Sequence, residues 1–316
     1  MKKALITGVN GQDGTYLAEF LKSIGYHVVG TIRSNSTPKD CLLNLGDIEL
    51  LEFDFTNESD ISELLLAVKP SEIYNFAAYA SGLGMFDDPI GIAEINGVSV
   101  AKILEGIVLM DSNIKFCQAS SSEMFGFVDE SPQSEITRFN PRTPYGAAKL
   151  YAHNMINIYR KHYGVFACSA ILYNHESPRR GLNFVTRKIV NAAVSIKNKV
   201  TDKLTLGALD VKRDWGFSED YVRAMYLMLQ HHQSDNYIIA SGEAHTVRDV
   251  CQIAFDYIGL DYRKYVKIVE ASSRAQETQV LVGNSSKARE TLGWKPSLEF
   301  SDLIRMMVDE EIKSFN

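Results

Sequence analysis

The stretch Thr7-Gly8-Val9-Asn10-Gly11-Gln12-Asp13-Gly14 decides the fold, because it joins a short apolar run to a helical pattern. The run Lys3–Thr7 predicts a buried strand, and apolar residues at helical spacing between Tyr16 and Ile24 predict a helix. A strand, a glycine-rich turn and a helix in this order predict a dinucleotide site whose pyrophosphate faces the helix N-terminus. The residues expected to contact the dinucleotide in this loop are Gly8, Gly11, Gln12, Asp13 and Gly14.

Short apolar runs continue to alternate with longer helical patterns up to residue 173. This alternation is typical of right-handed βαβ units, which build a parallel sheet. The expected fold class is therefore α/β, a Rossmann-type doubly wound parallel sheet. The expected strands are Val28–Ile32, Glu49–Phe53, Glu72–Ala77, Lys115–Ala119 and Val165–Tyr173, and the expected helices are Ile61–Val68, Val98–Leu109 and Tyr145–Tyr163.

The second half of the chain is less regular. Asn174–Asn183 is rich in Pro, Arg and Gly and predicts a loop, and a polar stretch runs from Leu206 to Trp215. One strand, Asn236–Ala240, is expected to return to the sheet. We therefore expect a dinucleotide-binding domain, residues 1–173, and a smaller C-terminal α/β substrate lobe, residues 174–316. The lobe is expected to contain a strand at Leu204–Leu206 and helices at Phe184–Ile196, Ser218–Leu229, Val247–Ile258 and Leu303–Ile312.

Composition narrows the functional classes. The chain has 316 residues and a formal charge of −6, which argues against nucleic acid as the main partner. Its four cysteines are widely spaced and form no CxxC pair, so a reducing compartment, the cytoplasm, is expected and no metal site is. The N-terminal apolar run is too short for a signal peptide or a membrane span, so no membrane partner is expected.

The end of the second strand bears on the choice of cofactor. In dinucleotide folds an acid there favours NAD, whereas a basic residue accommodates the additional phosphate of NADP. The segment Thr31–Ser36 contains Arg33 and hydroxyl side chains but no acid, so NADP is favoured, with NAD as the alternative. Asp54 follows the third apolar run and is expected either to bind the adenine amino group or to cap the turn after it.

Tyr145 and Lys149 are spaced to lie on one face of the long expected helix. A nearby ammonium lowers the pKa of a phenol, so Tyr145 is expected to act as a base toward a sugar hydroxyl. The segment Ser120-Ser121-Ser122-Glu123 follows an expected strand, and a hydroxyl from this strand end can bind the same sugar oxygen. Together these residues predict a redox site.

The glycine loop, the strand-end hydroxyl and the Tyr-x-x-x-Lys pair resemble the extended short-chain dehydrogenase/reductases. Longer segments are similar to the GDP-mannose 4,6-dehydratase family, and the similarity covers nearly the whole chain. Those segments are Gln118–Gly126, Pro141–Gly146, Asn174–Gly181, Phe184–Lys188 and Lys212–Gly216.

The resemblance implies a redox-neutral dehydration of a GDP-sugar. Tyr145 would take the O4 proton while the C4 hydride goes to the nicotinamide, and Ser121 would hold O4. Lys149 would bind the nicotinamide ribose, so that Tyr145 and Lys149 also contact the cofactor. Glu123 would remove the C5 proton that the 4-ketone has acidified, water would leave from C6, and the hydride would return to C6.

The resemblance also implies the remaining binding residues. In the family, the loop after the fourth strand lines the sugar pocket, so Ala77 is expected at the cofactor and Tyr79 at the sugar. The contacts to the nucleoside diphosphate and sugar are expected from Asn174, Lys188, Arg213, Arg274 and Glu277. The family further implies a homo-oligomer, either a dimer or a tetramer.

The chain departs from the family pattern at a few positions. Tyr79 and Ala80 replace Gln and Ser in the sugar loop, and Ala208 replaces an asparagine beside the nucleotide base. The segment Ser34-Asn35 lacks the family's second arginine. These departures leave alternatives open: a GDP-manno-heptose dehydratase, a GDP-sugar C4 dehydrogenase or epimerase that does not dehydrate, and a cofactor-bound protein without turnover.

Overall fold

Seven parallel strands form the central sheet of the protein, whose computed structural model describes residues 1–33, 46, 48–55, 61–79, 86, 88–269 and 280–315. The strand order is β10-β6-β5-β4-β1-β2-β3, so the order in which the chain adds strands reverses between β1 and β4. The predicted Rossmann-type fold class is confirmed. The strands are β1 (Lys3–Thr7), β2 (His27–Ile32), β3 (Glu49–Glu52), β4 (Glu72–Asn75), β5 (Lys115–Ser121), β6 (Ala167–Leu172) and β10 (Asn236–Ile239).

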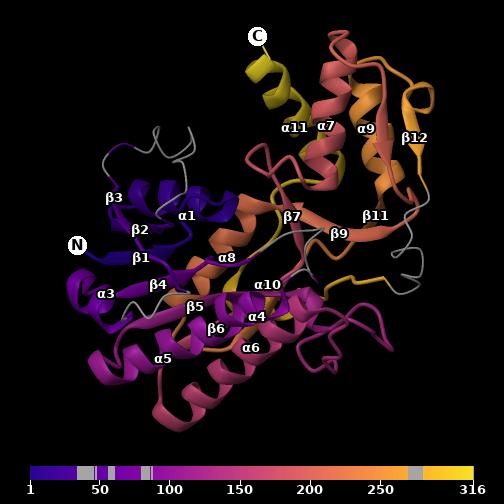
Figure 1. Cartoon of the computed structure of the whole chain (residues 1–316). Helices are drawn as coiled ribbons and strands as arrows, with labels where there is room; N and C mark the ends of the chain where they lie inside the picture. The colour runs from indigo at the N-terminus through magenta and orange to yellow at the C-terminus, as the bar shows by residue number, and fades with distance from the viewer. Residues whose placement is uncertain are drawn as a thin grey trace.

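Helices cover both faces of this sheet (Figure 1). Side chains alternate along each strand, so Ile6 of β1 packs toward one helical layer while its neighbour Leu5 packs toward the other. The first layer contains α1 (Gln12–Ser23), α8 (Ser218–Gln230) and α10 (Ser286–Leu292). The second contains α3 (Ile61–Val68), α5 (Ser99–Met110) and α6 (Pro144–Tyr163). The chain enters α5 through α4 (Pro89–Ala93) and a π-helical turn, η1 (Glu94–Val98).

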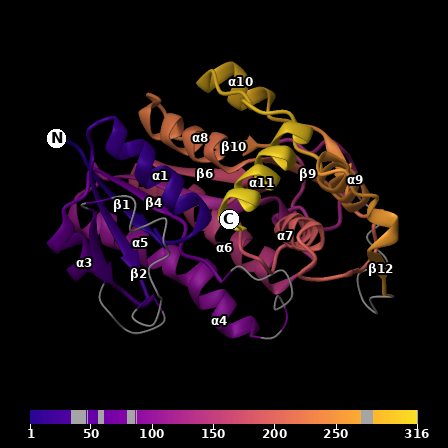
Figure 2. The same cartoon turned by 90° about the horizontal axis from the view of Figure 1, so that it is seen from above.

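A second apolar core lies beside the sheet, where α7 (Val185–Lys197), α9 (Val247–Tyr257) and α11 (Phe300–Phe315) pack together. Figures 1 and 2 both show this group to one side of the parallel sheet. Its helices cover β8 (Leu204–Leu206) and β9 (Lys212–Phe217). The remaining short elements are β7 (Asn174–Glu176), β11 (Ala244–Thr246), β12 (Val266–Ile268) and the 3₁₀ turns η2 (Ser122–Met124) and η3 (Tyr262–Lys264).

Two segments that the sequence predicts as irregular contain strands. The predicted loop Asn174–Asn183 begins with β7, and the polar stretch before Trp215 contains β9. β7 pairs with β9, which also pairs with β11 in a small three-stranded sheet. These strands form through pairing with partners distant in sequence, which local apolar patterning does not report. The third strand ends at Glu52, two residues before Asp54.

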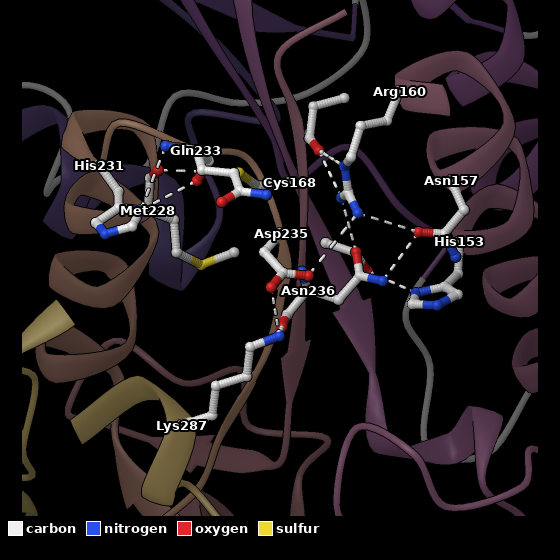
Figure 3. A network of polar contacts seen from close by, with 12 residues as sticks. His153, Asn157, Arg160, Cys168, Met228, His231, Gln233, Asp235, Asn236 and Lys287 are labelled. Carbon is white, nitrogen blue, oxygen red and sulfur yellow. Dashed lines mark hydrogen bonds and ion pairs between the residues drawn. The ribbon is translucent and has the colours of Figure 1, made fainter. Parts of the chain in front are cut away.

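The C-terminal end of helix α6 is anchored by a polar network (Figure 3). Arg160 donates from Nε and Nη2 to the Ala167 carbonyl oxygen, at 2.8 and 2.6 Å, and from Nη2 to Asn236 Oδ1 at 2.8 Å. Asn236 Nδ2 in turn donates to Asn157 Oδ1 at 2.9 Å. One guanidinium therefore connects α6 with β6 and with the returning strand β10.

We expect Arg160→Met to destabilise the fold by about 2 kcal/mol, because hydrogen bonds from a charged donor to partly buried acceptors are lost. Urea unfolding measures the change. The matched control is Arg305→Met, whose partner Asp302 lies on the surface of α11, with the two side chains 50% and 55% exposed. That control should stay within about 0.5 kcal/mol of the parent. Equal losses in the two variants would contradict the anchoring role.

Candidate active site

The glycine loop lies at the carboxyl end of β1, beside β4, where the order of the strands reverses. Gly8 has φ +65°, and a Cβ on Gly14 would lie 2.7 Å from the Gly8 carbonyl oxygen, so the turn admits no side chain at Gly14. Gly11 is the N-cap of α1 and has no side chain to occupy the N–H groups of the first turn. Those groups fit an anionic pyrophosphate, which is the fit that a dinucleotide requires.

The side chains of Gln12 and Asp13 point across to the segment that follows β6. Gln12 Nε2 donates to the His175 carbonyl oxygen at 3.2 Å, and Ser177 Oγ donates to Gln12 Oε1 at 2.8 Å. Ser218 Oγ donates to Asp13 Oδ1 at 2.7 Å. The side chains of these two residues thus connect the start of α1 with β7, the segment after it and the start of α8, while their backbone N–H groups belong to the first turn of α1.

Asp13 and His175 form a partly buried ion pair with Nε2 3.0 Å from Oδ2. The other ring nitrogen, Nδ1, lies 2.7 Å from the Tyr173 carbonyl oxygen, which can only accept. Burial lowers the pKa of His175, but the charge and hydrogen bond of Asp13 outweigh it and raise that pKa. Burial likewise raises the pKa of Asp13, and His175 and Ser218 outweigh it, so that pKa is lowered. Both ring nitrogens of His175 thus face acceptors, an arrangement that favours the protonated ring.

Tyr145, Ser121 and Glu123 meet where the start of α6 docks on the end of β5. Thr143 caps α6 by accepting from Gly146 N at 3.0 Å, and a Cβ on Gly146 would lie only 2.4 Å from the Glu123 carbonyl oxygen. This glycine lets the helix start approach the 3₁₀ turn that carries Glu123. The Ser121 hydroxyl accepts from Glu123 N at 3.2 Å and hydrogen-bonds the Tyr145 phenol.

Lys149 lies one helical turn after Tyr145 and is 1% exposed. Its Nζ donates to the Ala119 carbonyl oxygen at 2.8 Å and lies 5.7 Å from the centre of the Tyr145 ring. Burial lowers the pKa of this lysine to about 8. The ammonium is therefore held against the strand end that leads into Ser121.

The predicted lowering of the Tyr145 pKa by Lys149 is wrong for this structure. Burial raises the pKa of Tyr145 to about 12, the Ser121 hydrogen bond opposes this rise, and the Glu123 charge adds to it. Desolvation of the phenolate is the largest of these effects, and the Lys149 ammonium is itself hydrogen-bonded to the Ala119 carbonyl. Arg180 also lowers the Tyr145 pKa, and sequence reasoning left it out of the site although it lies in a quoted motif.

Glu123 is not a carboxylate on the open surface. Its side chain is 19% exposed, and its Oε2 lies 3.9 Å from Nε of Arg142, whose side chain is 12% exposed. The electrostatic effect of Glu123 on Tyr145 places the two groups in one site. A phenol, a hydroxyl and a carboxylate thus converge. This set can remove one proton from a hydroxyl group and another from the neighbouring carbon.

The predicted substrate residues of the second half lie on three elements. Asn174 opens β7 and pairs in register with Trp215 of β9, two residues from Arg213. Arg213 Nη1 donates to the Lys212 carbonyl oxygen at 2.8 Å. Lys188 of α7 donates to the Thr205 carbonyl oxygen at 2.9 Å.

The remaining predicted residues lie at the carboxyl edge or outside the described chain. Ala77 N donates to Thr7 Oγ1 at 3.1 Å, next to the glycine loop. Arg33 and Asp54 follow β2 and β3. Arg274 and Glu277, like Ser34, Asn35 and Ala80, lie outside the described residues.

Asn96 is a site residue that sequence reasoning missed. It lies in the π-helical turn, is 1% exposed, accepts from Tyr79 N at 2.8 Å and donates to the Tyr79 carbonyl oxygen at 3.3 Å. Both backbone groups of Tyr79 are thereby held. The available signal in the sequence was a single asparagine within a mainly apolar segment, since an amide buried there needs hydrogen-bond partners.

The comparison with protein families decides the family. The model described as GDP-mannose 4,6 dehydratase matches residues 5–307. The chain belongs to this family. A curated relative, GDP-mannose 4,6 dehydratase 2 of Arabidopsis thaliana, is 44% identical over 99% of this chain and 87% of its own length. The resemblance inferred from the sequence motifs is confirmed.

Solved structures at lower identity show the same fold. The dTDP-glucose 4,6-dehydratase of Bacillus anthracis in complex with NAD has a TM-score of 0.85 at 19% identity, covering 99% of this chain and 97% of its own. RMD from Pseudomonas aeruginosa complexed with NADPH has a TM-score of 0.80 at 20% identity, covering 99% of this chain and all of its own. Both are proteins with a bound nicotinamide dinucleotide.

Two further findings bear on location and metals. Within the described residues, no helix is long and apolar enough to cross a membrane. The same part of the chain contains no group of three His, Cys, Asp or Glu residues able to hold a metal ion. Cys117, Cys168 and Cys251 are buried free thiols.

We expect the Asp13–His175 pair to make stability depend on pH. Because the folded-state pKa of His175 is raised, its contribution is fully present below the unfolded value of about 6.5 and is lost as pH rises through the folded value. His175→Asn should therefore cost about 3 kcal/mol at pH 6, since it leaves a largely buried carboxylate unpaired, and less at pH 9. Urea unfolding at both pH values measures this. An equal cost at pH 6 and pH 9 would mean that the ring is uncharged.

Proposed function

We propose that this protein converts GDP-mannose to the GDP-4-keto-6-deoxy sugar by oxidation at C4, loss of water across C5 and C6, and reduction at C6. The observation that carries the proposal is Glu123, a shielded carboxylate beside the Ser121–Tyr145 pair. Oxidation or epimerisation at C4 needs no third acid/base group, whereas elimination needs one at C5. Membership of the GDP-mannose 4,6 dehydratase family supports the substrate.

Tyr145 takes the O4 proton of the sugar, and Ser121 holds O4 while its hydroxyl favours the phenolate. A bound nicotinamide cofactor would supply the hydride acceptor at C4 and the hydride donor at C6, and the proton that Tyr145 has taken from O4 would pass to C5 to balance the return. Lys149 holds the nicotinamide ribose and keeps a positive charge one helical turn from the phenol. Arg180 also favours the phenolate, because its guanidinium is near enough to lower the Tyr145 pKa.

Glu123 removes the C5 proton once the neighbouring ketone has acidified it. The electron pair of the C5–H bond then forms the C5–C6 double bond, the C6–O6 bond breaks, and the proton on Glu123 leaves with O6 as water. A short distance between acid and leaving group makes one carboxyl sufficient for both transfers. The guanidinium of Arg142, 3.9 Å from Glu123 Oε2, helps to orient the carboxyl group toward the step.

We further propose that Asn174, Lys188, Arg213, Arg274 and Glu277 contact the nucleoside diphosphate and sugar. Arginine and lysine suit a pyrophosphate because they form charge-assisted hydrogen bonds with its oxygens. For the cofactor we propose NADP, since Arg33 follows β2 and that strand end has no acid. The buried thiols agree with a reducing compartment such as the cytoplasm, and we propose a homo-oligomer, which light scattering tests.

The departure at Tyr79 favours one second candidate, a GDP-manno-heptose. Asn96 hydrogen-bonds both backbone groups of Tyr79, which supports a fixed position for this residue in the loop that we propose for the sugar. A different side chain there alters the shape offered to the hexose ring and its substituents.

Incubation with GDP-mannose and NADP⁺ should yield a product lighter by one water without build-up of NADPH, because the hydride returns to the sugar. Mass spectrometry and absorbance of the reduced cofactor measure both. GDP-manno-heptose run in parallel distinguishes the second candidate. Stoichiometric NADPH with no loss of water would contradict dehydration and indicate a C4 dehydrogenase.

Glu123→Gln should slow dehydration by about 100-fold or more, the contribution of a positioned acid/base group. C4 oxidation should persist, so cofactor reduction in a single turnover remains visible. Tyr145→Phe is the control that separates the steps, since it should abolish both cofactor reduction and water loss. Dehydration at the parent rate in Glu123→Gln would remove this residue from the mechanism.

A further inference from the structure

A row of polar side chains crosses the apolar core next to the catalytic lysine. Thr7, Asn75 and Gln118 occupy the neighbouring strands β1, β4 and β5, and each lies directly in register with the next. Adjacent parallel strands are only about 4.8 Å apart, so side chains in register on one face must meet. All three residues are at most 1% exposed.

These side chains form one continuous chain of hydrogen bonds. Ala77 N donates to Thr7 Oγ1 at 3.1 Å, and the Thr7 hydroxyl donates to Asn75 Oδ1. Asn75 Nδ2 donates to Gln118 Oε1 at 2.7 Å, and Gln118 Nε2 donates to the Ala119 carbonyl oxygen at 2.9 Å. Except at Ala77 N, which donates to Thr7, each side chain donates to the next one along the row, from Thr7 toward Ala119. Hydrogen bonds aligned in this way polarise and strengthen one another.

The chain ends at the carbonyl oxygen that holds Lys149. This oxygen accepts from Gln118 Nε2 at 2.9 Å and from Lys149 Nζ at 2.8 Å, so both of its lone pairs are used. The same carbonyl belongs to the residue two before Ser121. Gln118 thus contacts the backbone atom that places both the ammonium and the catalytic strand end.

The position of this row in the molecule calls for a role other than packing. Its strands contribute Leu5, Ile73 and Phe116 to the apolar core on the same sheet face, two positions earlier in each strand. Burying an amide among such side chains costs free energy unless every polar atom is paired. An amide also passes no proton in its ordinary form, so the chain orients groups rather than conducting protons.

We propose that Gln118 is a positioning residue for the reaction proposed above, acting through the Ala119 carbonyl to hold Lys149 against the nicotinamide ribose. Thr7 and Asn75 extend this support to the strand that carries the glycine loop. The ribose-binding ammonium and the phosphate-binding loop are thereby held by one hydrogen-bonded row, so that a bound dinucleotide meets both at a set separation.

The test is the affinity for NADP⁺, measured by fluorescence titration of the full chain without any sugar. Gln118→Met keeps the side-chain length but removes both hydrogen bonds, and we expect it to weaken NADP⁺ binding about 3- to 10-fold, as expected when a supporting partner of a binding residue is removed. Gln118→Glu keeps the acceptor for Asn75 and loses the donor to Ala119, and should weaken binding similarly. It serves as the measurement if Gln118→Met fails to fold, as judged by circular dichroism.

Two comparisons separate positioning from a general loss of structure. Ser169→Ala alters the next register position on β6, where Ser169 bonds to His153 and Ser120 and not to Lys149, and it should leave NADP⁺ affinity unchanged. In a Lys149→Met background, Gln118→Met should weaken binding no further, because Gln118 acts through Lys149. Additive losses in the double variant, or an equal loss in Ser169→Ala, would overturn the proposal.

Enzyme activity gives a second measurement, independent of the NADP⁺ titrations. With GDP-mannose as substrate, Gln118→Met should lower kcat about 10-fold or more and change the KM for the sugar less than about 3-fold, since no sugar contact is altered. If the protein does not act on GDP-mannose, the NADP⁺ titrations still decide the role of Gln118. If Gln118→Met binds NADP⁺ as tightly as the parent while dehydration of GDP-mannose is observed, the positioning role is wrong and the proposed function stands.

Discussion

The parallel pairing of β1 with β4 is the constraint on which the site depends. It reverses the strand order, so the loops after β1 and β4 leave the sheet side by side at its carboxyl edge. Two loops that diverge from neighbouring strands open a crevice between them, and a dinucleotide binds in such a crevice. The end of β5, with Ser121 and Glu123, follows on the next strand. The glycine loop and the proposed catalytic groups are therefore neighbours because of strand order, although more than 100 positions separate them in the sequence.

Electrostatics then joins the two halves of the molecule at that edge. His175, which follows β6, pairs with the carboxylate of Asp13 in the first turn of α1, and this partner raises the pKa of the imidazole. A glutamine and two serines complete the contact from both sides. Fully satisfied buried polar groups favour a single arrangement, because any displacement leaves a charge unpaired. The lobe that carries the proposed sugar contacts is thus held against the helix that would hold the cofactor.

Burial shifts the pKa values of Tyr145 and Lys149, both near the start of α6, in opposite directions. It raises the pKa of Tyr145 and lowers that of Lys149, so both groups are driven toward their neutral forms. The site counters this with neighbours: the Ser121 hydroxyl and Arg180 favour the phenolate, and the Ala119 carbonyl favours the ammonium. The positioning chain that ends on Ala119 belongs to the same balance. Its amides supply hydrogen bonds without adding a further charge.

Local patterning in the sequence was sufficient for the elements that begin the fold. The run Lys3–Thr7, the glycines after it and the i, i+4 spacing of Tyr145 and Lys149 are all local signals. They predicted β1 and α6 to within one residue, whereas α1 begins at Gln12, four residues before the apolar pattern that predicted it. The family motifs extended this to the candidate site. Strands β7 and β9 could not be predicted, because each is held by partners from distant parts of the chain rather than by its own apolar residues. The partner of Asp13, the raised pKa of Tyr145 and the row from Thr7 to Gln118 were likewise decided only by tertiary structure, since desolvation and strand register exist only after folding.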